Sequence, residues 1–140
     1  MVLAEHRLEG LESDLKELIR ITAEMGGLAE NQIAGAIEAL TRRDSERARR
    51  LLATDTAIDL MHRVIEERAI ESIANRCPGT SDLRYVIGIS RIANDLERIR
   101  DLAKNISKRV IAINGEEIPR QQAALIAPSP GERGPSPPHP

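Results

Sequence analysis

The sequence predicts an all-α protein, an antiparallel three-helix bundle with a Pro-rich C-terminal tail. Its 140 residues include one Tyr and no Phe or Trp. The core must therefore consist of Leu, Ile, Val, Ala and Met, which disfavours a β-sandwich. Apolar residues recur at steps of three and four, the period of an amphipathic helix. All of the eight prolines except Pro78 lie at or beyond Pro119, so helix-breaking residues are concentrated near the C-terminus.

The first predicted helix covers about residues 4–43 and contains no proline. Gly26 and Gly27 lie in its middle, where each glycine costs roughly 1 kcal/mol relative to alanine. We expect a tolerated kink there. The apolar face of this helix begins with residues three and four apart: Leu18, Ile21, Met25 and Leu28.

The second predicted helix covers about residues 44–76 and the third about residues 81–113. Asp44 can cap the second helix by accepting a backbone N–H of its first turn, and Pro78 ends it. Because the connections are short, we expect antiparallel neighbours. The third helix has a regular apolar seam of residues at alternating steps of four and three: Tyr85, Ile89, Ile92, Leu96, Ile99, Ala103, Ile106, Val110 and Ile113.

These helices form one predicted domain, residues 1–117, and the tail covers residues 118–140. From Ala127 onward the tail consists mainly of Pro, Ser and Gly. Such a segment has too little apolar surface to offset the entropy lost on ordering. We therefore predict that the tail is disordered.

Charge and composition exclude several functions. A net charge of −2 and the near absence of aromatic residues give no basis for binding nucleic acid. Cys77 is the only cysteine, so an internal disulfide or a multi-cysteine zinc site is excluded. No window approaches the ~20 apolar residues of a membrane span, and the N-terminus carries charge too early for a signal peptide. We also find no nucleophile and base pattern, and we expect a cytoplasmic protein that is not an enzyme.

Two predicted helices each carry a ridge of polar residues with a pair of acids four residues apart. On the second helix the ridge is Asp55, Asp59, His62 and Glu66. On the third helix it is Asn94, Glu97, Asp101 and Asn105. Carboxylates one helical turn apart can share a cation, and oxygen ligands suit Mg, Ca, Mn or iron. A solvated helix face explains the same pattern, and His62 is either an extra ligand or a surface histidine paired with an acid.

Several separated segments resemble the PhoU family, the accessory and regulatory proteins of phosphate-specific transport. They are SDLR at residues 81–84, IANDLERIRDLAKNI at 92–106, MGGLAE at 25–30 and DTAID at 55–59, and the resemblance covers roughly residues 10–113. It implies a three-helix bundle, usually present as two tandem copies in one chain. It also implies a role in shutting down phosphate uptake and phosphate-starvation signalling, through contacts with the phosphate transporter's ATPase and the sensor histidine kinase. The membrane would be involved only indirectly, through the transporter.

The resemblance also assigns metal binding to the acid pairs. The implied ligands are Asp55, Asp59, Glu97 and Asp101, with His62, Asn94 and Asn105 as weaker members, and the cofactor would be a divalent metal or iron. Arg100 stands where the family normally has glycine, so a bulky cation beside Asp101 either pairs with it or obstructs a metal. The chain resembles only the first of the family's two repeats, and we therefore expect a homodimer. The alternatives are a metal-binding helical bundle and a truncated, non-functional oligomerisation fragment.

Overall fold

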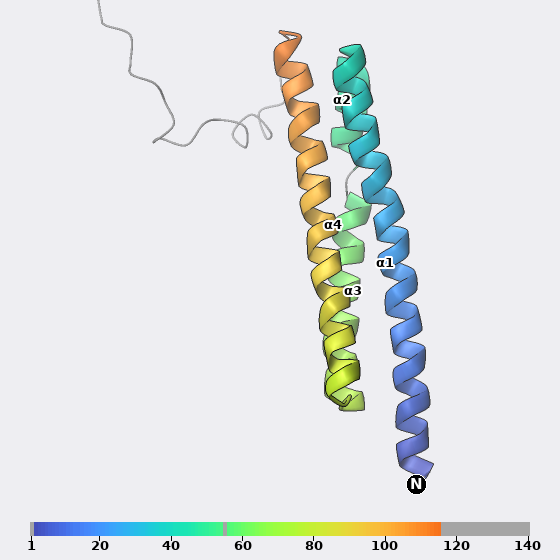
Figure 1. The fold of residues 1–140 in the computed structure, drawn as a ribbon. Helices are drawn as coiled ribbons and strands as arrows, with labels where there is room; N and C mark the ends of the chain where they lie inside the picture. Colours follow the sequence, from blue (N-terminus) through green and yellow to red (C-terminus); the bar gives the residue numbers. More distant parts are fainter. Residues whose placement is uncertain (1, 55, 116–140) are drawn as a thin grey trace, which may run out of the picture.

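A computed structural model describes residues 2–54 and 56–115 of the chain. The predicted all-α bundle is confirmed, and the described residues form four helices (Figure 1). These are α1 (Val2–Arg42), α2 (Ser45–Ala53), α3 (Thr56–Arg76) and α4 (Thr80–Ile113). None of these helices combines the length and the apolar character needed to cross a lipid bilayer. The predicted tail at residues 118–140 lies outside the described residues, so its disorder and the domain boundary stay predictions.

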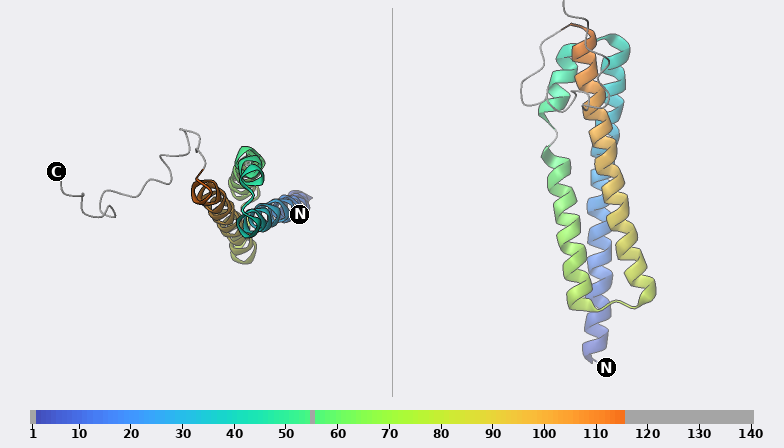
Figure 2. Two further views of the ribbon diagram at one scale, coloured as in Figure 1. Left: turned by 90° about the horizontal axis from the view of Figure 1, so that it is seen from above. Right: turned by 90° about the vertical axis from the view of Figure 1, so that its left-hand side faces the viewer.

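The bundle is long and narrow, with α1 and α4 running along most of its length (Figure 1). The short helix α2 and the longer helix α3 follow one another and together occupy the third position (Figure 2). α4 contacts each of the other three helices. Helices α3 and α4 lie side by side in this arrangement. The predicted polar ridge of each helix lies along the boundary between them.

The single helix predicted over residues 44–76 is wrong, because the structure divides it into α2 and α3. Thr54 ends α2 with φ −107° and ψ 19°, and its hydroxyl donates to the carbonyl of Leu51 at 3.3 Å. Gln32 of α1 donates to the same hydroxyl at 3.3 Å. Threonine and aspartate side chains compete with the backbone for hydrogen bonds and favour helix ends. Thr54 is therefore a local stop signal within the predicted helix.

The predicted cap at Asp44 is confirmed: its side chain accepts the backbone N–H of Arg47 at 3.0 Å. Arg43, just before it, has φ 54°, in the left-handed region that ends helices. α1 continues as one helix through Gly26 and Gly27.

The predicted seam of α4 is correct in part, because the helix is rotated slightly in the structure. Ile89, Ala103 and Val110 are buried as predicted, whereas Tyr85 and Ile92 are 53% and 52% exposed. A second row of residues seven apart is buried beside the confirmed seam residues: Val86, Ala93, Arg100 and Ser107. Small side chains such as Ala93 and Ser107 allow the backbones of packed helices to approach closely. The rotation buries the side chain of Arg100.

Two hydrophobic clusters hold the bundle together. The larger one joins α1, α3 and α4 near the middle of the molecule, through buried residues that include Leu18, Met25, Ile58, Ile65 and Ile89. The smaller one packs α2 against the C-terminal parts of α1 and α4. Its buried residues are Ala39, Ala48, Leu52, Val110 and Ile111. Burying one such Leu, Ile or Met side chain contributes about 1.5–3 kcal/mol, and the larger cluster packs α3 against α1 and α4.

Candidate functional site

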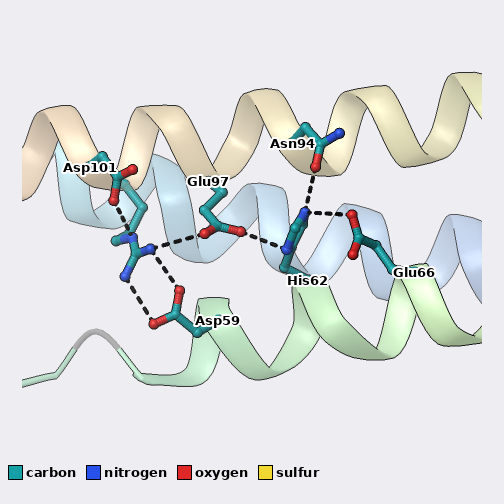
Figure 3. A network of polar contacts seen from close by, with 7 residues as sticks. Asp59, His62, Glu66, Asn94, Glu97 and Asp101 are labelled. Carbon is teal, nitrogen blue, oxygen red and sulfur yellow. Dashed lines mark hydrogen bonds and ion pairs between the residues drawn. The ribbon is translucent and has the colours of Figure 1, made fainter.

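The predicted acid ridges of α3 and α4 meet in one polar network (Figure 3). Helix α3 supplies Asp59, His62 and Glu66, and α4 supplies Asn94, Glu97, Asp101 and Arg100. We call these seven side chains the Arg100 network. The ridges are brought together because Ile58 and Ile65 of α3 are buried, which leaves the polar residues between them at the boundary with α4.

The guanidinium of Arg100 lies at the centre of one half of the network. Its Nη1 donates to Asp59 Oδ2 at 3.1 Å and its Nη2 lies 2.6 Å from Asp59 Oδ1, so one carboxylate takes both arms of the fork. Nη2 also lies 3.4 Å from Glu97 Oε1, and Nε lies 3.1 Å from Asp101 Oδ1. The Arg100 side chain is only 7% exposed. A single buried cation thus draws together carboxylates from both helices.

His62 is the centre of the other half. Its Nδ1 lies 2.7 Å from Glu97 Oε2. Its Nε2 lies 2.6 Å from Asn94 Oδ1 and 3.4 Å from Glu66 Oε1. Glu97 therefore joins the two halves, with one oxygen towards Arg100 and the other towards His62 (Figure 3).

Most of the residues that the sequence selects are found together, with two exceptions. Asp55 lies outside the described residues. Asn105, one helical turn beyond Asp101, is exposed and is not a member of the Arg100 network. The sequence analysis predicts Arg100 only as a neighbour of Asp101. It does not predict that Arg100 lies among the carboxylates of both helices. The available signal was the heptad of Val86, Ala93, Arg100 and Ser107 that forms the buried stripe of α4.

The arrangement of these side chains does not fit a metal ion. In residues 2–54 and 56–115, no group of three or more His, Cys, Asp or Glu side chains is placed so that it could hold one. The physical reason is the position of Arg100: its guanidinium stands between the oxygens of Asp59, Glu97 and Asp101. The metal assignment of the ridge, which also involves the undescribed Asp55, stays a prediction.

A second surface feature is an apolar groove of about 620 Å³ between α1 and α4. Its lining includes exposed Ile19, Tyr85 and Ile92. At Gly26 an added Cβ would meet only Leu96 Cδ1, at 3.9 Å, and at Gly88 it would meet nothing within 4 Å. The floor of the groove is therefore open to a neighbouring apolar side chain. Contiguous exposed apolar surface of this kind is typical of protein interaction sites.

Comparison with known proteins gives a consistent result. Residues 22–110 match the PhoU domain family. The chain is 47% identical over 118 residues to a protein of Rhizobium meliloti (strain 1021), named phosphate-specific transport system accessory protein PhoU homolog, covering 84% of this chain and 50% of the relative. It is 37% identical over 111 residues to the homolog of Caulobacter vibrioides, with coverages of 79% and 48%. For homolog 1 of Thermotoga maritima the values are 36% over 114 residues, 81% and 46%. The chain thus spans about half the length of the curated relatives it matches.

Proposed function

Because the chain belongs to the PhoU family, we propose that it regulates phosphate uptake and phosphate-starvation signalling by binding other proteins, without catalysing a reaction. The observation that carries this proposal is the match over residues 22–110, which extends from α1 to the end region of α4. The relatives that match it are named as accessory proteins of the phosphate-specific transport system.

The proposed partners are the ATPase of the phosphate transporter and the sensor histidine kinase. Both contacts would be made in the cytoplasm, and the membrane would be reached only through the transporter. The exposed apolar groove between α1 and α4 and the charged ridge of α3 and α4 are the two surfaces that support a role in protein binding.

A pull-down tests this proposal. The purified full chain is immobilised and presented with the transporter ATPase and with the cytoplasmic part of the sensor kinase. The Rhizobium meliloti relative serves as the positive control. We expect the chain to retain at least one of the two partners. If the relative retains both proteins and the chain retains neither, the regulatory function is wrong for this chain.

We further propose that two copies of the chain associate through the groove between α1 and α4. Ile19, Tyr85 and Ile92 expose apolar surface there. Light scattering at micromolar concentration should give the mass of two chains, and Ile92→Glu should give the mass of one. Ile70→Glu is the matched control, because Ile70 is 67% exposed but lies on α3. A monomer for the unmodified chain contradicts the proposal.

Two other functions are supported by single observations. The convergence of Asp59, Glu97 and Asp101 supports a bundle whose main function is to bind a divalent metal or iron, provided that Arg100 is displaced. The exposed groove supports a bare oligomerisation module. A chain that dimerises but retains neither partner would favour the oligomerisation module. Titration of the chain with Mn²⁺ tests the metal-binding bundle.

A further inference from the structure

The Arg100 network brings more negative than positive charge together where α3 meets α4. Three carboxylates, those of Asp59, Glu97 and Asp101, contact one guanidinium. Their side chains are 42%, 29% and 60% exposed, whereas Arg100 is 7% exposed. The cation is therefore covered by the acids, and solvent reaches the outer side of the carboxylates only.

A metal ion and this guanidinium would compete for the same oxygen atoms. Magnesium and calcium bind carboxylate oxygens at about 2.0–2.6 Å, and both oxygens of Asp59 already face the two arms of Arg100. The two oxygens of Glu97 lie 3.4 Å from Arg100 Nη2 and 2.7 Å from His62 Nδ1. A guanidinium keeps its positive charge in proteins, so a second cation bound beside it would be repelled.

We propose that Arg100 is the resident cation of this acidic site. Its guanidinium fills the position that a divalent ion would need and neutralises the carboxylates in place of a metal. Metal binding at Asp59, Glu97 and Asp101 then requires removal or displacement of Arg100. The inference does not depend on the regulatory function, since it concerns only which cation these carboxylates hold.

The choice of arginine suits this position physically. Its planar fork matches the two oxygens of Asp59, while Nε lies 3.1 Å from Asp101 Oδ1 as an ion pair. A lysine ammonium would preserve the charge but would not reproduce the two-point contact. Side-chain geometry and charge together therefore favour an arginine at this position over a lysine.

Manganese titration of the full chain tests the proposal, with free Mn²⁺ followed by electron paramagnetic resonance and heat followed by calorimetry. We expect the unmodified chain to bind weakly, with a Kd of about 1 mM or higher. Arg100→Ala should bind Mn²⁺ about tenfold or more tightly, because it exposes three converging carboxylates without their cation. Mn²⁺ should also raise the melting temperature of Arg100→Ala, while that of the unmodified chain stays constant.

Three further variants separate displacement of a cation from a general change in charge. Arg98→Ala removes an 81% exposed arginine of the same helix, which pairs with Asp95 at 3.8 Å, and should bind Mn²⁺ as weakly as the unmodified chain. Arg100→Lys keeps the charge and should remain a weak binder. Arg100→Ala combined with Asp59→Asn should lose the gain in affinity.

The outcome that overturns the proposal does not require the alanine variant to fold. If the unmodified chain binds Mn²⁺ with a micromolar Kd and Asp59→Asn abolishes that binding, a metal can displace Arg100 or bind beside it. Equal affinities of a folded Arg100→Ala and the unmodified chain would also contradict it. A failed pull-down would contradict the regulatory function but would not change the Mn²⁺ affinities. The proposal about Arg100 and the proposed function can therefore fail independently.

Discussion

The Arg100 network and a second arginine cluster on α1 have similar geometry but different surroundings. Arg20 donates through Nε and Nη2 to Glu17, at 3.0 and 2.7 Å, and through Nη1 to Glu24 at 3.1 Å. Arg100 makes a fork of comparable length to Asp59, at 3.1 and 2.6 Å. However, the Arg20 side chain is 60% exposed and that of Arg100 is 7% exposed. Short ion pairs alone therefore say little about stability, and burial decides what they contribute.

The two arginines also differ in which residues they contact. Among the described residues, Arg20 itself bonds Glu17 and Glu24, three and four positions away on its own helix, and such pairs stabilise a helix surface weakly. The link from this cluster to α3 is made by Glu17, which lies 3.2 Å from Arg68. Arg100 links α4 to Asp59 of α3 across the bundle. A change at Arg100 therefore disturbs the packing of two helices, whereas a change at Arg20 alters a solvated face.

The largest expected effect is that of Arg100→Ala. This substitution leaves three carboxylates close together without their cation and removes a buried aliphatic stem. We expect a loss of roughly 2–3 kcal/mol in the free energy of unfolding, below the ~3–5 kcal/mol of a fully buried pair, because water can reach the carboxylates. Urea denaturation followed by circular dichroism measures it. Arg20→Ala is the matched control and should leave the urea midpoint within experimental error. Equal effects of the two variants would remove the distinction between the clusters.

A smaller effect is expected when the carboxylates are changed instead of the arginines. Asp59→Asn keeps the shape of the side chain but removes its charge, and Arg100 then retains Glu97 and Asp101 as partners. We expect a loss of roughly 1–2 kcal/mol. The comparison variant is Glu24→Gln, since Glu24 pairs with the exposed Arg20, and it should unfold at the same urea concentration as the unmodified chain. A neutral Asp59→Asn would show that the fork contributes little.

The smallest expected effect is a pH dependence on the exposed side. The hydrogen bond from Arg20, with the charges of Arg20 and Arg68, holds the pKa of the Glu17 carboxyl below its ordinary 4.5. Because the folded-state pKa is lowered, the stabilisation is present above pH 4.5 and is lost as the pH falls through the folded-state value. Carbon NMR of the Glu17 carboxyl should show a pKa that rises towards 4.5 in Arg20→Ala. An unchanged pKa would exclude Arg20 as the cause.

Much of the fold follows from local sequence signals. The apolar periodicity predicts the helices that become α1 and α4, the Asp44 cap predicts the start of α2, and the spacing of the acids predicts a polar ridge on each of two helices, but not that these ridges meet. The break at Thr54 was missed because one threonine hydroxyl, bonded to Leu51 and Gln32, ends a helix that the apolar pattern continues.

The rotation of α4 was missed for a different reason. The apolar pattern places Tyr85 and Ile92 in the seam, but the buried positions beside Ile89, Ala103 and Val110 are the neighbouring residues Val86, Ala93, Arg100 and Ser107. Packing selects the stripe of Ala93 and Arg100, because small residues allow close contact and Arg100 finds acids on α3. A periodicity argument counts an arginine as surface, so it could not place Arg100 inside the network.

A double-mutant cycle on Arg100 and Asp59 tests most directly the claim that the ridge is organised around a buried cation. The free energies of unfolding of Arg100→Ala, Asp59→Asn and the double variant are compared with those of the matching cycle on Arg20 and Glu24. We predict a coupling energy above about 1 kcal/mol for Arg100 and Asp59, and none beyond experimental error for Arg20 and Glu24. Additive effects in the Arg100 cycle would contradict the claim.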